Sequence, residues 1–505
     1  MIVGKRKILA LAVVAVLAIG ALTGMAATEH WNDASLVSQG KIAVAGVNAS
    51  ASWGEWKNAW NQVKNDYTQV SLAPGSDQSQ LNLGWYSKTP TPGGAKVKIA
   101  DNRDMRQSKE FQGTSLVGTV ISGTQYYSNK VTVKGLKPSH SYWYQVKTDG
   151  QWQDPQQYKT GKTDTVNIMF VGDPQIGASK GQVPAEGSVK QTSELATRND
   201  AFNWNKMMNA ALQQHPEINF MISAGDQINE VASKGSSDEI QQQEYQYAGF
   251  LSPAALRSLP VATTIGNHDS LTNGYGNHFN TPNPFTSEQN PTAAGHGYYY
   301  SYGSALFIVL NTNNYNAADH KTLIEKAIAA NPSAKWRIVM IHQDVYGSGL
   351  DHSDSDGIIL RTQLTPIFDA ARIDVVLQGH DHTYARTYQL SGDGKTHESF
   401  GKAVKLGDES VKIDFLKENL CYNIVDKRQG IVKDPKGVFY MTANSATGSK
   451  FYELIPTQQD YIAKRNQTWR PTYSVINISG NQFSITTYDV ATGKPIDDTY
   501  TIVKN

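Results

Sequence analysis

Five short segments of the chain place carboxylates, amides or histidines directly after a run of apolar residues. They are, in order, Gly172-Asp173-Pro174-Gln175, Gly225-Asp226-Gln227-Ile228-Asn229, Gly266-Asn267-His268-Asp269, Ile341-His342 and Gly379-His380-Asp381-His382. Side chains of these types are ligands for divalent transition metals. Two such ions about 3.5–4 Å apart lower the pKa of a bound water and hold the oxygens that enter and leave phosphorus. The five segments together predict a two-metal hydrolytic site.

Each segment taken alone has an ordinary structural interpretation. An aspartate after a strand or after a glycine is usually a turn or cap residue, and Asn267 after Gly266 suits a left-handed turn. A single histidine such as His342 is more often a hydrogen-bonded core residue than a ligand. The occurrence of all five segments in one chain is what favours metal chemistry.

The apolar runs in front of these segments predict the strands that position them. From Thr165 onward strand-like runs alternate with helical patterns, which indicates an α/β domain. The expected strands are 166–171, 220–224, 261–265, 305–311, 337–341 and 375–378, with further strands at 437–443, 473–478 and 483–488. Ligands of open α/β sheets gather beyond the carboxyl ends of the strands, so the five segments are expected to meet there.

Two amphipathic helices are expected between these strands. The first carries apolar residues on one face and ends before Pro216; these residues are Phe202, Met208, Ala211 and Leu212. The second begins at Asp319, which is predicted to cap it, and stops before Pro332. Residues 391–436 are polar and glycine-rich, and are interpreted as a loop insertion near the active face.

The chain before Thr165 predicts β-structure. Alternating runs at 81–86, 130–133 and 142–146 stand between turns, with a helix over 55–65. Gly135-Leu136-Lys137-Pro138 followed by Ser141-Tyr142-Trp143-Tyr144 resembles the late-strand corner of fibronectin type III domains. Residues 28–162 are therefore predicted to form an all-β sandwich, and residues 163–505 the catalytic domain.

Composition and the N-terminus limit the class and location of the protein. A chain of 505 residues is expected to hold two or more domains, and a formal net charge of +1 indicates no nucleic-acid-binding surface. Cys421 is the only cysteine, which excludes an intramolecular disulfide. A basic start, an apolar stretch over 8–22 and small residues at 24–26 predict a signal peptide over residues 1–27. We expect a secreted or cell-surface protein without a stable membrane span; the alternative is an uncleaved anchor.

The motifs at Asp173, Asp226, Asn267-His268-Asp269, His342 and His380-Asp381-His382 resemble those of the calcineurin-like metallophosphoesterase superfamily. The front sandwich and the stretches 261–269 and 379–386 look most similar to the purple acid phosphatase branch, and the resemblance extends from about residue 75 to the C-terminus. It implies a four-layer α/β/β/α catalytic domain. It also implies an enzyme that hydrolyses phosphate monoesters through a hydroxide bound to two metal ions, which would be manganese, zinc or iron, in divalent or mixed-valence form. We expect this enzyme to be exported because of the predicted signal peptide.

The resemblance also implies a role for each site residue. Asp226 would bridge both metals. Asp173 and His382 would bind the first metal, and Asn267, His342 and His380 the second. His268 would act as general acid at the leaving-group oxygen, and Asp269 would orient His268.

Two positions depart from the family pattern. Purple acid phosphatases carry an iron-binding tyrosine three residues after the bridging aspartate, where this chain has Asn229. Most other members carry a histidine two residues after the first aspartate, where this chain has Gln175. Gln175 and Asn229 are therefore further candidate ligands, and the expected enzyme holds no tyrosinate-bound ferric iron and is not purple.

Several alternatives remain open at this point. Phosphodiesters or nucleotides would suit the same site as a small phosphorylated monoester. The front sandwich would also suit a protein that binds cell-wall polymer or a surface partner, with a weak or inactive phosphoesterase domain. Ser179, within Gly177-Ala178-Ser179-Lys180-Gly181, fits the nucleophile pattern of serine hydrolases but stands too far behind its strand. His278, His296 and His352 are not positioned by the sequence, and a surface location is the default.

Overall fold

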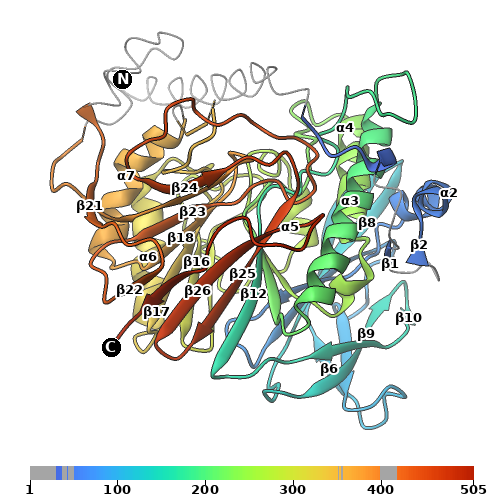
Figure 1. The fold of residues 1–505 in the computed structure, drawn as a ribbon. Coiled ribbons are helices and arrows are strands. Elements are labelled where there is room, and N and C mark those ends of the chain that lie inside the picture. The colour runs from blue at the N-terminus through green and yellow to red at the C-terminus, as the bar shows by residue number, and fades with distance from the viewer. Residues whose placement is uncertain (1–29, 37–41, 44–49, 351, 354–355, 398–417) are drawn as a thin grey trace, which may run out of the picture.

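The computed structural model describes residues 30–36, 42–43, 50–350, 352–353, 356–397 and 418–505 (Figure 1). The predicted signal peptide lies outside the described residues, and so does the middle of the predicted insertion at 391–436. Among the helices that are described, none is long and apolar enough to cross a membrane.

The N-terminal part of the chain forms two small sheets that share one core. Helix α2 (Trp53–Lys64) precedes them and begins after Ser52, which forms a capping box with Glu55. The sheets have the strand orders β3-β4-β8-β7 and β10-β9-β5-β6, with β11 also paired to β9. The strand bounds are β3 Ser71–Pro74, β4 Leu81–Ser87, β5 Lys96–Ala100, β6 Lys109–Gln112, β7 Thr114–Ile121, β8 Thr124–Val133, β9 Ser141–Thr148, β10 Gln151–Trp152 and β11 Gln156–Lys159. Leu83 of one sheet and Val97 of the other lie in the same apolar cluster. The predicted N-terminal β domain and its helix are confirmed.

The rest of the chain forms two seven-stranded mixed sheets. The first has the order β14-β13-β12-β25-β26-β27-β22, and the second β15-β16-β17-β18-β23-β19-β24. The first sheet consists of β12 Thr165–Val171, β13 Phe220–Ser223, β14 Val261–Thr263, β22 Ile431–Lys433, β25 Thr472–Ser479, β26 Gln482–Asp489 and β27 Tyr500–Val503. The second consists of β15 Tyr298–Tyr302, β16 Ala305–Val309, β17 Trp336–Met340, β18 Val375–Gln378, β19 Tyr384–Thr387, β23 Phe439–Thr442 and β24 Ile462–Asn466. A strand has formed at each predicted position.

Three apolar clusters define the layers of this part. Alternating residues of β12 point to opposite faces of the first sheet, as strand geometry requires. Met169 packs outward against helices α3 (Ser193–Gln214) and α4 (Ser237–Leu251), whereas Ile168 packs inward against residues of the second sheet. Helices α6 (Ala317–Ala330) and α7 (Asp356–Ala370) contribute to the cluster on the outer face of the second sheet. The two sheets therefore lie between two pairs of helices (Figure 1).

Some local expectations need correction. Asn316 is the N-cap of α6, because its side chain accepts a hydrogen bond from the Ala318 amide; Asp319 lies inside the helix. Helices α4 and α7 were not expected from the sequence. The described ends of the predicted insertion contain two strands between loop residues: β21 (Asn423–Asp426), which pairs with β20 (Gln389–Ser391), and the edge strand β22.

Candidate metal centre

The five predicted segments meet at one edge of the two sheets. Strands β12, β13 and β14 run parallel to one another, and so do β17 and β18, so their carboxyl ends lie together within each sheet. Each segment begins at or just after the end of one of these strands. The Gly379 backbone of the second sheet approaches the Asp173 carboxylate of the first, which brings the two edges into contact.

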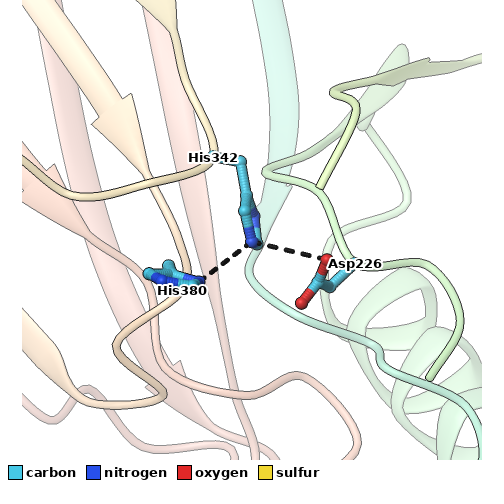
Figure 2. Close-up of side chains that lie close together, drawn as sticks. All are labelled: Asp226, His342 and His380. Atoms are coloured by element: carbon cyan, nitrogen blue, oxygen red, sulfur yellow. Dashed lines mark hydrogen bonds and ion pairs between the residues drawn. The ribbon is translucent and has the colours of Figure 1, made fainter. Parts of the chain in front are cut away.

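The closest group of ligand atoms comes from Asp226, His342 and His380, whose donor atoms lie within 4.8 Å of one another (Figure 2). His342 Nε2 is 3.4 Å from Asp226 Oδ1, 3.1 Å from His380 Nδ1 and 2.9 Å from Asn267 Oδ1. His342 Nδ1 lies 2.9 Å from the Ala224 carbonyl oxygen, which only a protonated Nδ1 satisfies. In the neutral ring, Nε2 then presents a lone pair to other electron-pair donors, an arrangement that a cation stabilises.

A second group of donors lies beside the first. Asp173 Oδ1 is 3.6 Å from His382 Nε2, while Asp173 Oδ2 accepts a hydrogen bond of 2.8 Å from the His380 amide. His382 Nδ1 donates to the Lys450 carbonyl at 2.7 Å, which directs Nε2 toward Asp173. Asp173 Oδ1 and Gln175 Oε1 are buried and have no hydrogen-bond partner among the described atoms. Buried oxygens without donors are unfavourable, so this donor set fits a bound cation.

The backbone around the donors is unusual. Positive φ angles occur at Asp173 (38°), Gln175 (34°), Asp226 (47°), His380 (72°) and His382 (48°). The left-handed region is unfavourable for residues with a Cβ, and such strain gathers at functional sites. These five residues are among the eight predicted donors, so the fold holds them in conformations that local preference does not favour.

The charged groups of the centre depend on one another. Burial would lower the pKa of His342, but Asp226 and Asp173 attract its proton and raise that pKa to about 10. Burial likewise opposes ionisation of Asp226, yet His342 and His268 hold the pKa of this carboxyl far below its ordinary value. The pKa of Asp173 is raised well above its ordinary value, mainly by burial. Positive charge on His342 and His268 thus stabilises the Asp226 carboxylate, and a metal ion bound there would supply such charge in their place.

His268 and Asp269 lie at the centre, but their relation differs from the expectation. The His268 side chain is 17% exposed, against 0–2% for Asp226 and His342, so it is the group that reaches toward solvent. Its Nδ1 contacts the Asn229 carbonyl oxygen. Asp269 instead accepts hydrogen bonds from the Gly266 and Gln227 amides. Asp269 therefore holds together the loops after β13 and β14, and the Asn229 backbone orients His268.

One segment of the centre was missed in the sequence. Ser445 and Thr447 follow β23 and donate hydrogen bonds to the carbonyls of Asp173 and Pro174, at 3.1 and 2.7 Å. Because β23 is parallel to β18, its carboxyl end reaches the same edge of the sheet. The signal was available, since Asn444 and Ser445 follow an apolar run in the same way as the five segments do.

The other candidates have different locations. Ser179 is buried and its Oγ accepts a hydrogen bond from Gln191, so it does not occupy an exposed nucleophile turn. His278 is buried beside Glu244, contrary to the surface default, and His296 lies near Glu288. The ring of His352 packs against His380 with 3.8 Å between centroids, which places it at the metal centre.

Two family models match the chain. The model for calcineurin-like phosphoesterases matches residues 166–384, and the model for the purple acid phosphatase N-terminal domain matches residues 67–160. An uncharacterized protein of Mycobacterium tuberculosis is 22% identical over 329 residues, which span 60% of this chain and 56% of that protein. Purple acid phosphatase 1 of Ipomoea batatas is 20% identical over 409 residues, or 79% of this chain and 76% of that protein.

Two solved structures share the fold. A purple acid phosphatase from yellow lupin (Lupinus luteus) seeds has a TM-score of 0.58 at 14% identity, with 87% of this chain and 75% of that chain covered. PhoD has a TM-score of 0.52 at 14% identity, with 86% of this chain and 93% of that chain covered. The family implies divalent metal ions, which agrees with the donor set at Asp226, His342 and His380. The chain thus joins a purple acid phosphatase N-terminal domain to a calcineurin-like metallophosphoesterase domain, and it spans little more than half the length of the first curated relatives that it matches.

Proposed function

We propose that the protein is an exported phosphatase that hydrolyses phosphate monoesters with two bound metal ions. One observation carries the proposal: the predicted ligands, which come from five separate strand ends, converge at one buried edge of the sheets. Such convergence of carboxylates, an amide and imidazoles suits a pair of metal ions better than a structural hydrogen-bond network, because electron-pair donors face one another there.

The donors divide into two sets around Asp226. Its Oδ1 faces His342, and its Oδ2 lies 3.9 Å from His268 Nε2, so Asp226 is the proposed bridge. Asn267, His342 and His380 would hold one cation; Asp173 and His382, with Gln175 as a neutral oxygen donor, would hold the other. Bound there, two cations would lower the pKa of a water and stabilise negative charge at phosphorus.

His268 is the proposed general acid. Its Nδ1 is fixed on the Asn229 carbonyl, so the ring is oriented and Nε2 faces the centre. Burial lowers the pKa of His268, which favours the neutral ring before substrate enters. An entering phosphate dianion favours the protonated ring, because opposite charges attract. Nε2 then donates its proton to the departing alkoxide, a role worth about 10²–10⁴-fold in rate.

The first test is hydrolysis of para-nitrophenyl phosphate by the mature chain. We expect turnover that a chelator abolishes and that manganese, zinc or iron(II), added back singly, restores. Asp226→Asn should lose this turnover, whereas the matched exposed variant Asp498→Asn should keep it. Turnover that survives chelation, or an active Asp226→Asn protein, would refute the two-metal proposal.

Bis-para-nitrophenyl phosphate distinguishes the diester alternative. A pair of metal ions would suit either ester class, because it would hold the oxygens that enter and leave phosphorus in both, so the site does not select between them. Faster metal-dependent hydrolysis of the diester than of the monoester would favour a phosphodiesterase. No hydrolysis of either ester with any metal would favour the surface-binding protein.

The finer assignments of fold and location belong to the same proposal. We propose a fibronectin type III-like sandwich over residues 28–162 and a four-layer catalytic domain over 163–505. The shared core of the two small sheets and the helix pairs outside the two large sheets support these assignments. Sequencing the N-terminus of the exported protein tests the signal peptide, with cleavage expected near residue 27.

A further inference from the structure

A buried carboxylate outside the metal centre supports the turn that follows β12. Asp200 lies in α3, and its side chain is fully buried. Its Oδ2 accepts hydrogen bonds from the amides of Gly177 and Ser179, at 2.9 and 3.2 Å. Its Oδ1 has no hydrogen-bond partner among the described atoms. Burying a carboxylate in this way is unfavourable, so its hold on the turn explains Asp200 better than packing does.

The turn needs support because its backbone is strained. The φ angle is 34° at Gln175 and 106° at Gly177, so two residues of the turn lie in the left-handed region. The Gln175 amide donates a hydrogen bond of 2.8 Å to the Asp226 carbonyl, which ties the start of the turn to the loop after β13. Asp200 holds the end of the turn from α3. The backbone of Gln175 is therefore fixed from both sides.

The side chain of Gln175 depends on this fixed backbone. Gln175 stands where most members of the resembled superfamily carry a histidine. Its Oε1 is a neutral carbonyl oxygen, a donor that suits manganese, and it is buried without a hydrogen-bond partner among the described atoms. A glutamine side chain has several rotatable bonds, so holding Oε1 in one place costs conformational entropy. A rigid turn lowers that cost, because it leaves fewer conformations open to the donor.

We propose that Asp200 is a positioning residue for the first metal ion, because it fixes the turn that presents Gln175 Oε1 to that ion. This inference rests on the proposed function, in which Asp173, His382 and Gln175 hold the first ion. Asp200 does not touch the metal and acts through the backbone amides of the turn. Residues that orient metal ligands from behind contribute about 10–100-fold in metal affinity.

Calorimetric titration of the metal-free full chain with Mn²⁺ tests the proposal. The binding step that Gln175→Ala weakens identifies the first metal ion. Asp200→Ala should weaken the same step about 10-fold or more and the other step by less than about 3-fold. In a chain that already carries Gln175→Ala, Asp200→Ala should add less than about 2-fold, because the donor that Asp200 positions is gone.

Two further variants separate positioning from stability. Asp200→Asn keeps an oxygen that can accept both amides, and it should bind both ions as the unchanged chain does. Burial raises the pKa of Asp200 to about 7, so a neutral side chain is tolerated at this place. Thr197→Val is the matched control on the same helix, since it removes a buried hydroxyl that donates to the Ser193 carbonyl at 2.7 Å. It should lower the Tm without changing either Mn²⁺ step.

The outcomes distinguish this inference from the proposed function. Equal weakening of both Mn²⁺ steps, no weakening of either, or a further loss of about 10-fold in the double variant overturns the role of Asp200. If Asp200→Ala does not fold, Asp200→Glu takes its place: it keeps the acceptors, but its extra methylene displaces the turn, so the same step should weaken. If the chain binds two Mn²⁺ ions and hydrolyses no phosphate ester, the proposed function fails, while the Mn²⁺ steps still decide the role of Asp200.

Discussion

Asn229 occupies the position at which purple acid phosphatases carry their iron-binding tyrosine. The contacts seen here come from its backbone: its amide donates to Gln246 Oε1 at 2.9 Å, and its carbonyl contacts His268 Nδ1. Those contacts do not depend on the side chain, so residue 229 can be exchanged without releasing His268. Substitutions of Asn229 therefore test which side chains bind the first metal ion.

Loading with ferric iron should leave the unchanged protein without a tyrosinate-to-iron absorption band in the visible range. Asn229→Tyr should gain such a band, because a phenolate oxygen then stands where the family places its ligand. Asn229→Phe, which has the ring without the oxygen, is the control and should stay colourless. A visible charge-transfer band in the unchanged protein would contradict the assignment.

Glycines that follow the strands leave room for the ligand side chains. A Cβ at Gly266 would stand 2.0 Å from Asp226 Oδ1, and one at Gly379 would stand 2.7 Å from Asp173 Oδ2. Real Cβ atoms do not approach oxygen so closely, so any side chain at these positions must displace the carboxylate. The loops after β14 and β18 can hold the donors together only because these positions lack a side chain.

Gly266→Ala should destabilise the protein by about 1–3 kcal/mol and weaken metal retention, because overpacking moves Asp226. Thermal unfolding and the metal content after dialysis measure the two effects. Gly54→Ala is the matched control: Gly54 lies in α2 with nothing near its Cβ position, so alanine should stabilise by about 0.4–1 kcal/mol. Full metal retention by Gly266→Ala would show that the close approach is not needed.

Elements were predictable where one local pattern decided them. The strands before the five segments were found because apolar runs end at a glycine or sharp turn. Helix α4 was missed because Gln243, Glu244 and Gln246 are polar yet buried, and their hydrogen-bond partners lie outside the helix. Helix α7 was missed because Pro366, normally a helix breaker, lies inside it.

The partners within the candidate site were less predictable than its members. The sequence identified Asp173, Asp226 and His380 by type and position, but not which group contacts which. Asp269 stands next to His268 in the chain, which suggested that it orients this ring. The fold instead turns its carboxylate toward the amides of Gly266 and Gln227. Contacts between loops from different strands cannot be deduced from spacing along the chain.

At the scale of the whole molecule, a buried polar network connects the N-terminal domain with the metal centre. Tyr86 of β4 donates a hydrogen bond of 3.2 Å to Glu244, which lies 2.8 Å from His278 Nε2. The ring of Tyr247 packs on His278, and its hydroxyl donates to Asp269. Burial raises the pKa of Tyr86 well above its ordinary value, so the phenol keeps the proton that it donates. These contacts thus link the N-terminal domain to Asp269, which supports the loops of the metal centre.

Tyr86→Phe should lower the free energy of unfolding by about 1–3 kcal/mol, because it leaves a buried carboxylate oxygen without its donor. Turnover should fall as well, because Glu244 lies on α4 close to Tyr247, whose hydroxyl donates the hydrogen bond to Asp269. Tyr127→Phe, at a half-buried neighbour on β8, should stay within about 0.5 kcal/mol of the unchanged protein. If Tyr86→Phe alters neither stability nor turnover, the N-terminal domain does not support the catalytic domain through this network.

The position of β12 has a consequence for when the metal centre can form. This strand carries Asp173 and lies between β13, about 50 residues later, and β25, about 300 residues later in the chain. A chain made from its N-terminus therefore cannot enclose β12 until the segment from Thr472 onward has emerged. Until then the loop that bears Asp173 follows a strand that lacks one of its two neighbours, β25. Synthesis order alone thus delays assembly of the metal centre until the C-terminal strands have been made.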